Sequence, residues 1–468
     1  MISFATVVER ALTGPICTER DFELGIFVPN LRKVVEKYGI KYDPQHPVPA
    51  DDDLADRVWA AAMEFLLETG VYCLDTERRI LFTQEEIEGA LETGPRGHVF
   101  GEGKDAKAMP RRFPEDKTPP WCSVGPTSSP VSSELYYVNL VKAHAENPLG
   151  DSITIPCLTH VDGQQIVGGS PLGVEGAIRA VLLTREGMRR AGRPGMPIVN
   201  GVTTATRAQE HIAAHHFGIR QTDALEIGTV HEMKIDFDSM NKVAYSLAAG
   251  SLIFAENGVI LGGLAGGPAG VAVVIAAYNP VDLLLLRGAV QHPFPTHFDL
   301  GVTSTRDSIW ARSLANQAVT RNSTLPVVNV GYSAAGPMTK MLLYEHSAWV
   351  IGSVVSGGSV EVGASARGTA LDYTSPMDPL FGSEVAHAVA GMSRKEANGI
   401  VNALLEKYED KLRDPPIGQK YQECYNVVSG KPNQEFIELY REVRREMADQ
   451  FGLPFKFTVL IPGGEFYS

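Results

Sequence analysis

Two glutamates interrupt or close apolar runs that have the composition of β-strands. Glu226 lies within residues 224–227 (ALEI), and Glu256 ends residues 252–256 (LIFAE). A carboxylate in an apolar strand is costly to bury unless a cation or a hydrogen-bond donor meets it. A structural salt bridge would explain either residue alone, whereas two carboxylates on neighbouring strands suit a cationic substrate or acid–base chemistry. Glu226 and Glu256 are therefore the candidate catalytic residues.

A second group of chemically capable residues is a set of histidines. His211 and His215 are four residues apart in a helical pattern, and His216 is adjacent. This spacing can place two imidazoles on one metal ion. The segment lacks the glutamate that follows the first histidine in an H-E-x-x-H metalloprotease motif. We expect no metal site, and a metal-assisted hydrolase or lyase that uses these histidines with Glu226 and Glu256 is the alternative.

Two glycine-rich segments, residues 262–270 and 357–368, complete the inventory of possible binding motifs. Neither spells the dinucleotide-binding or P-loop pattern. The chain also has no G-x-S-x-G nucleophile motif. Turns use glycine for its backbone freedom, so these segments do not by themselves indicate a phosphate site.

The composition narrows the class of protein. The 468 residues are 44% hydrophobic with a net charge of −13, which argues against nucleic acid or an anionic membrane as partner. The five cysteines are widely spaced without C-x-x-C, which disfavours disulfides and structural zinc. The first residues do not have the pattern of a signal peptide, and no run approaches the roughly 20 apolar residues of a membrane span. We expect a cytoplasmic protein.

The pattern of elements divides the chain into three parts. Residues 1–145 read as a helical and loop extension, with helical periodicity at 54–68 and a capping box at Thr83 and Glu86. Residues 101–130 read as a long loop. Residues 391–468 return to helices, which begin with a second capping box at Ser393 and Glu396 and which we expect to pack on the central part.

The central part, residues 146–390, alternates β-branched runs with helical stretches. The candidate strands are residues 152–158, 196–202, 224–229, 252–256, 259–264, 298–304, 326–332 and 349–355. Such alternation is typical of a parallel α/β fold, and eight repeats match a closed (βα)8 TIM barrel better than an open sheet. In this fold the reacting groups sit at the carboxyl ends of the strands.

Several segments resemble the monomethylamine:corrinoid methyltransferases. Residues 191–196 (AGRPGM) resemble the segment that precedes pyrrolysine in that family, and the similarity continues without a gap to Glu226 and through residues 231–236. Further similar segments are residues 66–73, 125–130, 262–267, 301–306, 335–337 and 422–425. Because they keep the family's order over almost the whole chain, the chain is identified as a member of this family.

The resemblance implies a TIM barrel that holds the methyl donor, and a separate corrinoid protein whose Co(I) takes the methyl group. In the family, pyrrolysine orients the amine beside two glutamates and a glutamine. The two glutamates correspond to Glu226 and Glu256, but Val199 stands at the pyrrolysine position and Val330 at the glutamine position, beside a retained Asn329. The expected substrate-binding residues are Val199, Asn200, Asn329, Val330, Tyr332 and Arg306.

These departures point to a different methyl donor. An amine anion is a poor leaving group, and valine cannot supply the electrophile that pyrrolysine offers. A quaternary ammonium or other onium compound leaves as a neutral molecule, and Tyr332 could share its charge through a cation–π contact. We expect transfer from such a donor, with no cofactor besides the partner's corrinoid. A non-catalytic amine-binding homologue is a second alternative. The resemblance also implies a homo-oligomer, such as a hexamer.

Overall fold

The described residues form eight parallel strand segments that follow one another in chain order around a closed barrel. The computed structural model describes residues 1–199, 207–363, 370–455, 460–461 and 465–466. The strand segments are β5 (Cys122–Val124), β7 (Ser152–Ile153), the bridge at Ile198, β11 (Ala224–Gly228), β13 (Leu252–Leu261), β14 (Val290–His297), β15 (Val328–Val330) and β16 (Ser359–Val362). The barrel closes where β16 pairs with β5, with Val360 opposite Cys122. The predicted (βα)8 fold is confirmed.

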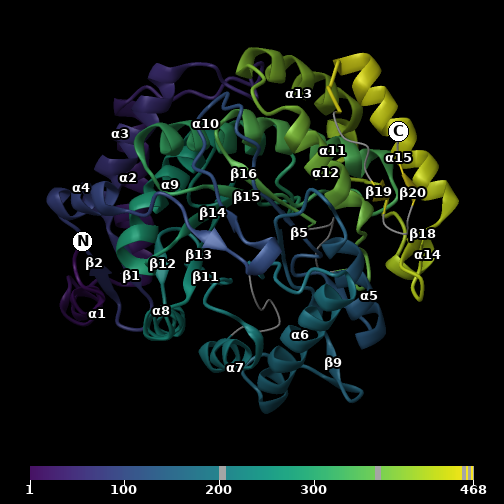
Figure 1. Ribbon diagram of the computed structural model, residues 1–468. Helices are drawn as coiled ribbons and strands as arrows, with labels where there is room; N and C mark the ends of the chain where they lie inside the picture. Colours follow the sequence, from purple (N-terminus) through teal and green to yellow (C-terminus); the bar gives the residue numbers. More distant parts are fainter. Residues whose placement is uncertain (200–206, 364–369, 456–459, 462–464, 467–468) are drawn as a thin grey trace.

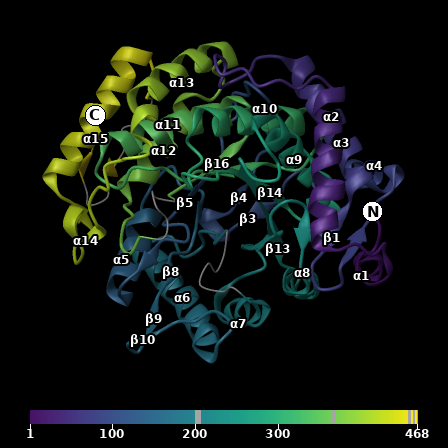
Figure 2. The same ribbon diagram turned by 180° about the vertical axis from the view of Figure 1, so that it is seen from behind.

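The helices that link these strands cover the outside of the barrel (Figures 1 and 2). They are α5 (Glu134–Ala145), α6 (Pro171–Arg190), α7 (Ala208–Gly218), α8 (Phe237–Ala249), α9 (Pro268–Val281), α10 (Arg306–Asn322), α11 (Lys340–Val355) and α12 (Met377–Ala388). Several begin at a side chain that accepts a hydrogen bond from the first turn, as Ser170, Asp236 and Thr305 do. The sequence thus marks where the helices start after the strands.

Several strand predictions require correction. The predicted strand 252–256 is part of β13, but residues 259–261 belong to the same strand, which ends at Leu261 before residues 262–264. Residues 298–304 form no strand but follow β14, and residues 200–202 of the predicted strand 196–202 lie outside the described residues. Residues 349–355 lie in α11, whose residues from Met341 onward are all buried, so that no polar face reveals a helical period. The barrel also begins at β5, in a stretch predicted to be loop, rather than at residue 146.

The N-terminal extension is helical, as predicted. Its main elements are α1 (Phe4–Thr13), η1 (Asp21–Phe27), α2 (Val28–Lys37), α3 (Asp52–Thr69), β1 (Val71–Cys73), β2 (Arg78–Ile80) and α4 (Gln84–Thr93). The capping box of Thr83 and Glu86 is present. Helix α3 packs against α9 and α10, so the extension is fixed to one flank of the barrel.

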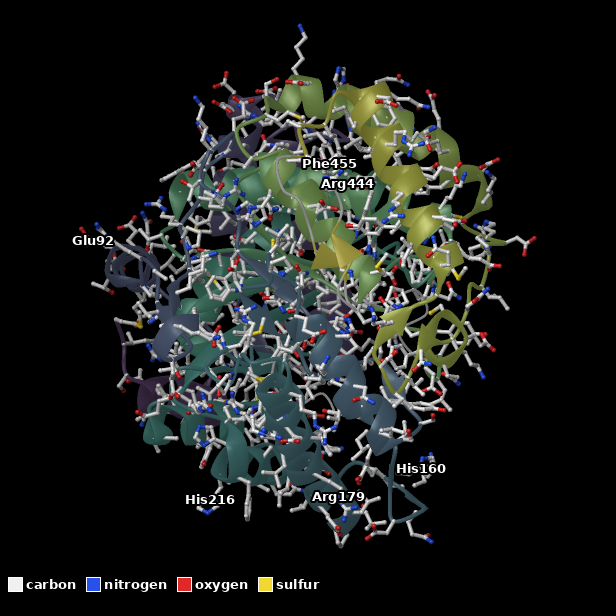
Figure 3. All side chains as sticks on the ribbon, turned by 45° about the vertical axis from the view of Figure 1, so that its right-hand side comes forward. Glu92, His160, Arg179, His216, Arg444 and Phe455 are labelled. Carbon is white, nitrogen blue, oxygen red and sulfur yellow. The ribbon has the colours of Figure 1, made fainter. Side chains whose placement is uncertain are left out.

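The C-terminal helices cover the opposite flank, as the two ribbon views show (Figures 1 and 2). Helix α13 (Arg394–Tyr408) packs against α11, and α15 (Gln434–Phe451) contacts α11 and α12. The Arg444 guanidinium lies 4.7 Å from the centre of the Phe455 ring, and Figure 3 labels both residues. The remaining short elements are β3 (Val99–Phe100), η2 (Gly103–Asp105), β4 (Lys107–Ala108), β6 (Pro130–Val131), β8 (Cys157–Leu158), β9 (His160–Val161), β10 (Gln164–Gln165), β12 (Lys234–Ile235), η4 (Glu409–Lys411), α14 (Tyr421–Cys424), β17 (Tyr425–Asn426), β18 (Lys431–Pro432), β19 (Leu460–Ile461) and β20 (Glu465–Phe466).

A separate apolar cluster, the interior floor, contains residues near the amino-terminal ends of several barrel strands. Trp121, Phe254, Val290 and Val328 come from different strands or strand ends, yet they pack together with Phe100 from β3. Side chains alternate between the two faces of a strand, so residues two positions further along point to the same side. On each strand, the next residue on the same face as the interior floor therefore lies closer to the carboxyl end of the strand.

One segment meets the length and composition of a membrane span. Pro268–Leu286, which comprises α9 and the π-helix η3 (Asp282–Leu286), is apolar over 19 residues, contrary to our expectation that no run is long enough. Within the structure 94% of its most apolar stretch is buried. This burial is what a core helix of the barrel requires.

Candidate active site

The two candidate glutamates lie on adjacent strands of the barrel, directly above the interior floor. Glu226 is on β11 and pairs with Phe254 of β13, while Glu256 is two residues further along β13 and pairs with Gly228. Both side chains are largely shielded, and that of Glu226 is 13% exposed. A Cβ atom at Gly228 would lie 3.0 Å from Oε2 of Glu256. The glycine therefore leaves room for this carboxylate.

A buried histidine connects Glu226 to a third glutamate. His292 on β14 pairs in register with Glu256, and its Nδ1 lies 3.4 Å from Oε1 of Glu226. Its Nε2 lies 3.6 Å from Oε2 of Glu361 on β16. The side chain of His292 is 1% exposed and that of Glu361 is fully buried. An imidazole thus stands between two carboxylates inside the barrel.

Glu361 is held in place by a short chain of hydroxyl groups. Its Oε1 accepts a hydrogen bond of 2.8 Å from Thr127, which follows β5. Thr127 is in turn 2.8 Å from the hydroxyl of Thr154, which follows β7. Because Thr127 donates its proton to the carboxylate, Thr154 donates to Thr127. The two threonines thus fix the position of the Glu361 carboxyl group.

The electrostatics of Glu226 and Glu256 set them apart from surface carboxylates. Burial raises the pKa of each to about 8, and for Glu256 the negative charge of Glu226 adds to the effect. No Arg or Lys pairs with either carboxylate among the described residues, and the nearby Lys242 pairs with Asp238 at 3.1 Å. Within the part of the chain that the structure describes, neither carboxylate forms an ion pair with Arg or Lys, and a positively charged ligand would supply such a partner.

Aromatic rings border the carboxylates. The Phe254 ring lies 5.0 Å from His292, edge to face, and Phe294 and Tyr332 pack edge to face at 5.7 Å. Burial, together with the charges of Glu256, Glu226 and Glu361, raises the pKa of Tyr332 well above its usual value. Tyr332 is therefore within electrostatic reach of all three glutamates, as a residue that shares a cation with them must be.

Two of the remaining predicted residues lie inside the barrel. Val330 points to the same face of β15 as the floor residue Val328 and pairs with Glu361. Val199 is fully buried and belongs to the interior floor, next to the start of the segment that contains Asn200. Asn200 itself lies outside the described residues. The two valines present hydrocarbon to the site.

The structure does not bring Asn329 and Arg306 to this cluster. Asn329 is on the outward face of β15, where its amide donates to the carbonyl of Ser359 at 3.4 Å. Arg306 begins α10, and its guanidinium binds Glu409, Asn402 and the carbonyl of Pro44. The first prediction fails because neighbouring residues of a strand face opposite sides, and the second because a peripheral ion pair binds the arginine.

The histidines of α7 are not arranged as a metal site. The two nitrogens of His215 contact the hydroxyls of Ser251 and Tyr245. His211 is buried, which lowers its pKa to about 3, and His216 points away from the barrel into solvent (Figure 3). No cluster of three or more metal-binding side chains occurs in the part of the chain that the structure describes.

The sequence analysis missed His292, Glu361, Thr127 and Phe294. The strand that carries His292 and Phe294 also contains two prolines, Pro293 and Pro295, which hide a strand pattern. Glu361 lies in the glycine-rich segment 357–368, which does not have the pattern of a strand. A signal was nevertheless available, because Glu361 interrupts the apolar run SVEV as Glu226 interrupts ALEI.

A closed barrel with ionisable groups at the carboxyl ends of its strands defines a (βα)8-barrel enzyme. The model of one family, monomethylamine methyltransferase MtmB, matches residues 2–453. The chain belongs to this family, and the corrinoid-dependent methyltransferase class expected from the sequence is confirmed.

Individual relatives agree with this assignment. Monomethylamine methyltransferase MtmB of Methanosarcina mazei is 33% identical over 450 residues, which cover 96% of this chain and 97% of that protein. MtmB1 of Methanosarcina barkeri is 32% identical with the same coverage. The crystal structure of the Methanosarcina barkeri enzyme superimposes with a TM-score of 0.93 at 31% identity over 97% of this chain and 98% of that one. A hydroxylamine complex of MtmB matches equally well.

Proposed function

We propose that this methyltransferase takes a methyl group from a quaternary ammonium or other onium compound and gives it to the Co(I) of a corrinoid carried by a separate protein. The observation that carries the proposal is the group of Glu226, Glu256 and Glu361 inside the barrel, with no Arg or Lys paired to the first two among the described residues. A positively charged donor would give these two carboxylates the ionic partner that the described residues do not provide.

The chemistry of the leaving group supports the onium donor. In the transfer the carbon–nitrogen bond breaks with both electrons on nitrogen, while Co(I) provides the pair for the new cobalt–carbon bond. A quaternary ammonium leaves as a neutral amine without a proton or an electrophile. The resemblance places Val199 where the family has pyrrolysine, and the fully buried valine offers only hydrocarbon. The methyl donor must therefore already contain a group that can leave as a neutral molecule.

The surroundings of the carboxylates suit a cation that cannot donate hydrogen bonds. The faces of aromatic rings attract quaternary ammonium groups. Phe254 pairs in register with Glu226, Tyr332 interacts with all three glutamates, and Phe294 packs edge to face against Tyr332. The interior floor is apolar, with Val199 and Trp121. The carboxylates and these rings together would bind a methylated cation through its charge and its methyl groups.

The decisive experiment mixes the purified protein with a Co(I) corrinoid protein and a panel of donors. The panel contains tetramethylammonium, glycine betaine, trimethylsulfonium and monomethylamine. We expect the absorbance of methyl-Co(III) to form with at least one onium donor, and much more slowly with monomethylamine. Turnover of monomethylamine alone would overturn the proposed donor class. Tight donor binding without any transfer would favour an amine-binding protein.

The assembly is a second part of the proposal. The expected homo-oligomer stays a prediction, which light scattering coupled to size exclusion would test. A cognate corrinoid protein should co-elute with the enzyme, because its cobalt has to reach the carboxyl ends of the strands, where Glu226 and Glu256 lie.

A further inference from the structure

We propose that His292 accepts the proton that Glu226 gives up when a cationic donor binds, so that this proton stays inside the protein. The inference rests on the proposed function insofar as the site must bind a cation. His292 would act through Glu226, so it is a positioning residue that does not contact the reacting atoms.

His292 lies between Glu226, which would give up the proton, and Glu361, which would stabilise the protonated ring. Its Nδ1 is 3.4 Å from Glu226, and its Nε2 is 3.6 Å from Glu361. Neither nitrogen forms a hydrogen bond with a described residue, and a small movement of both carboxyl groups toward the ring would bring the two pairs to hydrogen-bonding distance. The imidazole is 1% exposed, so direct exchange of its protons with bulk solvent is hindered. The short route for the proton of Glu226 therefore leads to His292.

The far side of the ring is prepared for a positive charge. Glu361 receives a hydrogen bond from Thr127, which keeps the carboxylate oriented toward Nε2 of His292. A carboxylate at this distance attracts a positive charge on the ring. Proton transfer from Glu226 to Nδ1 thus creates an ion pair with Glu361 on one side of the ring. On the other side it leaves an ionised Glu226 that faces the donor.

Three other ionisable groups act on this pair. Glu256 pairs in register with His292, and its own pKa is also raised to about 8, so it holds a separate proton in the free site. Tyr332 interacts with Glu226, Glu256 and Glu361, and Lys242 of α8 acts on Glu226 and Glu256. In the free site Glu226 holds the proton, as its raised pKa of about 8 indicates. With a cation bound, the carboxylate becomes the better partner and the proton moves to His292. It returns when the neutral product leaves.

The test measures protons released when a cation binds. Calorimetric titration of wild type and His292→Gln with tetramethylammonium chloride, in buffers of different ionisation enthalpy, gives this number between pH 6 and 8. We expect His292→Gln to release about one proton more than wild type, because Glu226 then loses its proton to solvent. Its Kd should therefore rise by a further factor of about ten, relative to wild type, for each unit by which the pH falls.

This pH dependence separates the proposed role from a merely structural one. A structural defect would weaken binding by the same factor at every pH, whereas the proposal predicts that the two Kd values converge above about pH 8, where Glu226 of the free protein is ionised. Glu361→Gln, which leaves His292 in place, should shift the proton count in the same direction as His292→Gln. The Glu361→Gln variant provides the test if His292→Gln fails to fold.

A matched control uses a histidine outside the cluster. His231 is exposed, its Nδ1 lies 3.0 Å from the carbonyl of Gly258, and His231→Gln should keep the wild-type proton count. Equal counts in wild type, His292→Gln and Glu361→Gln would overturn the role of His292. If neither tetramethylammonium nor methylammonium binds the wild type, the proposed function itself fails.

Discussion

Two buried carboxylate sites in this barrel differ in how their charge is satisfied. Glu345 on α11 accepts hydrogen bonds from the hydroxyl of Ser304 and the backbone N–H groups of Ala334 and Ala335, and its pKa rises to about 7. Glu226 and Glu256 accept no hydrogen bond from any described residue, and the pKa of each rises to about 8. We call the first the Glu345 anchor and the second, with His292 and Glu361, the carboxylate cluster.

The comparison distinguishes the Glu345 anchor, whose carboxylate stabilises the fold, from the carboxylate cluster, whose carboxylates can bind a ligand. The oxygens of the Glu345 anchor accept hydrogen bonds from the loop after β15, so replacing Glu345 should lower the free energy of unfolding. Glu226 and Glu256 of the carboxylate cluster accept no hydrogen bond from the described residues, so replacing them should cost function. Buried polar groups without partners are destabilising, and functional sites are where proteins retain them.

The largest expected effect is on catalysis. Replacing Glu226 and Glu256 together by Gln removes the negative charge that faces the donor while it keeps the shape of the site. We expect kcat/KM for methyl transfer to fall by about 10³-fold or more. The control is Glu232→Gln, which alters another buried glutamate near the end of β11 outside the cluster and should leave kcat/KM unchanged. A double variant with near wild-type activity would remove the cluster from the mechanism.

The next effect belongs to the Glu345 anchor. At pH 8, above the pKa of about 7, Glu345→Gln replaces a carboxylate that accepts hydrogen bonds from three donors. We expect the free energy of unfolding in urea to fall by about 2–3 kcal/mol. The activity of the folded fraction should largely persist. If instead stability is unchanged and transfer is lost, the distinction between the two sites is wrong.

The pH dependence of stability sharpens the comparison. Because burial raises the pKa of Glu226 and Glu256 above their ordinary value of 4.5, the folded state favours their protonated forms. Their contribution to stability is therefore present below about pH 4.5 and is lost as the pH rises toward 8. The Tm of the ligand-free protein should fall over this range. The Glu226→Gln and Glu256→Gln double variant should show a shallower fall, and an equally steep one would contradict the assignment.

The smallest effect concerns Val199. Val199→Ala removes two methyl groups from the interior floor and should lower the free energy of unfolding by roughly 1–3 kcal/mol. Because valine does no chemistry, transfer from an onium donor should continue at a similar rate per folded molecule. Loss of transfer in a stably folded variant, measured by methyl-Co(III) absorbance, would show that Val199 shapes the site more closely than we propose.

Prediction from sequence worked where one local pattern decided the structure. Glu226 and Glu256 stand out because carboxylates are rare in apolar strands, and the structure places them on adjacent strands. The capping box of Thr83 and Glu86 and the helix of residues 54–68 follow from hydrogen bonding and periodicity within a few residues. At Ser393 only half of the predicted box forms, because its side chain accepts a hydrogen bond from the N–H of Glu396. Prediction failed for α11 because a fully buried helix has no polar face, and its residues 349–355 read as a strand.

The same error explains why half of the carboxylate cluster was missed. With residues 349–355 taken as the last strand, β16 and its Glu361 fell into a glycine-rich turn. With residues 298–304 taken as another strand, His292 was left in the preceding connection. A wrong strand assignment thus removed the residues that complete the site.

By itself the sequence determined the fold class, the family and two acidic residues, because alternating hydrophobicity and long runs of similar residues are properties of the chain. Only the tertiary structure decided that His292 lies between Glu226 and Glu361, and that Asn329 faces away from them. These facts depend on strand register and on the closing of β16 against β5, which bring together residues separated by more than a hundred positions. No local pattern carries that information.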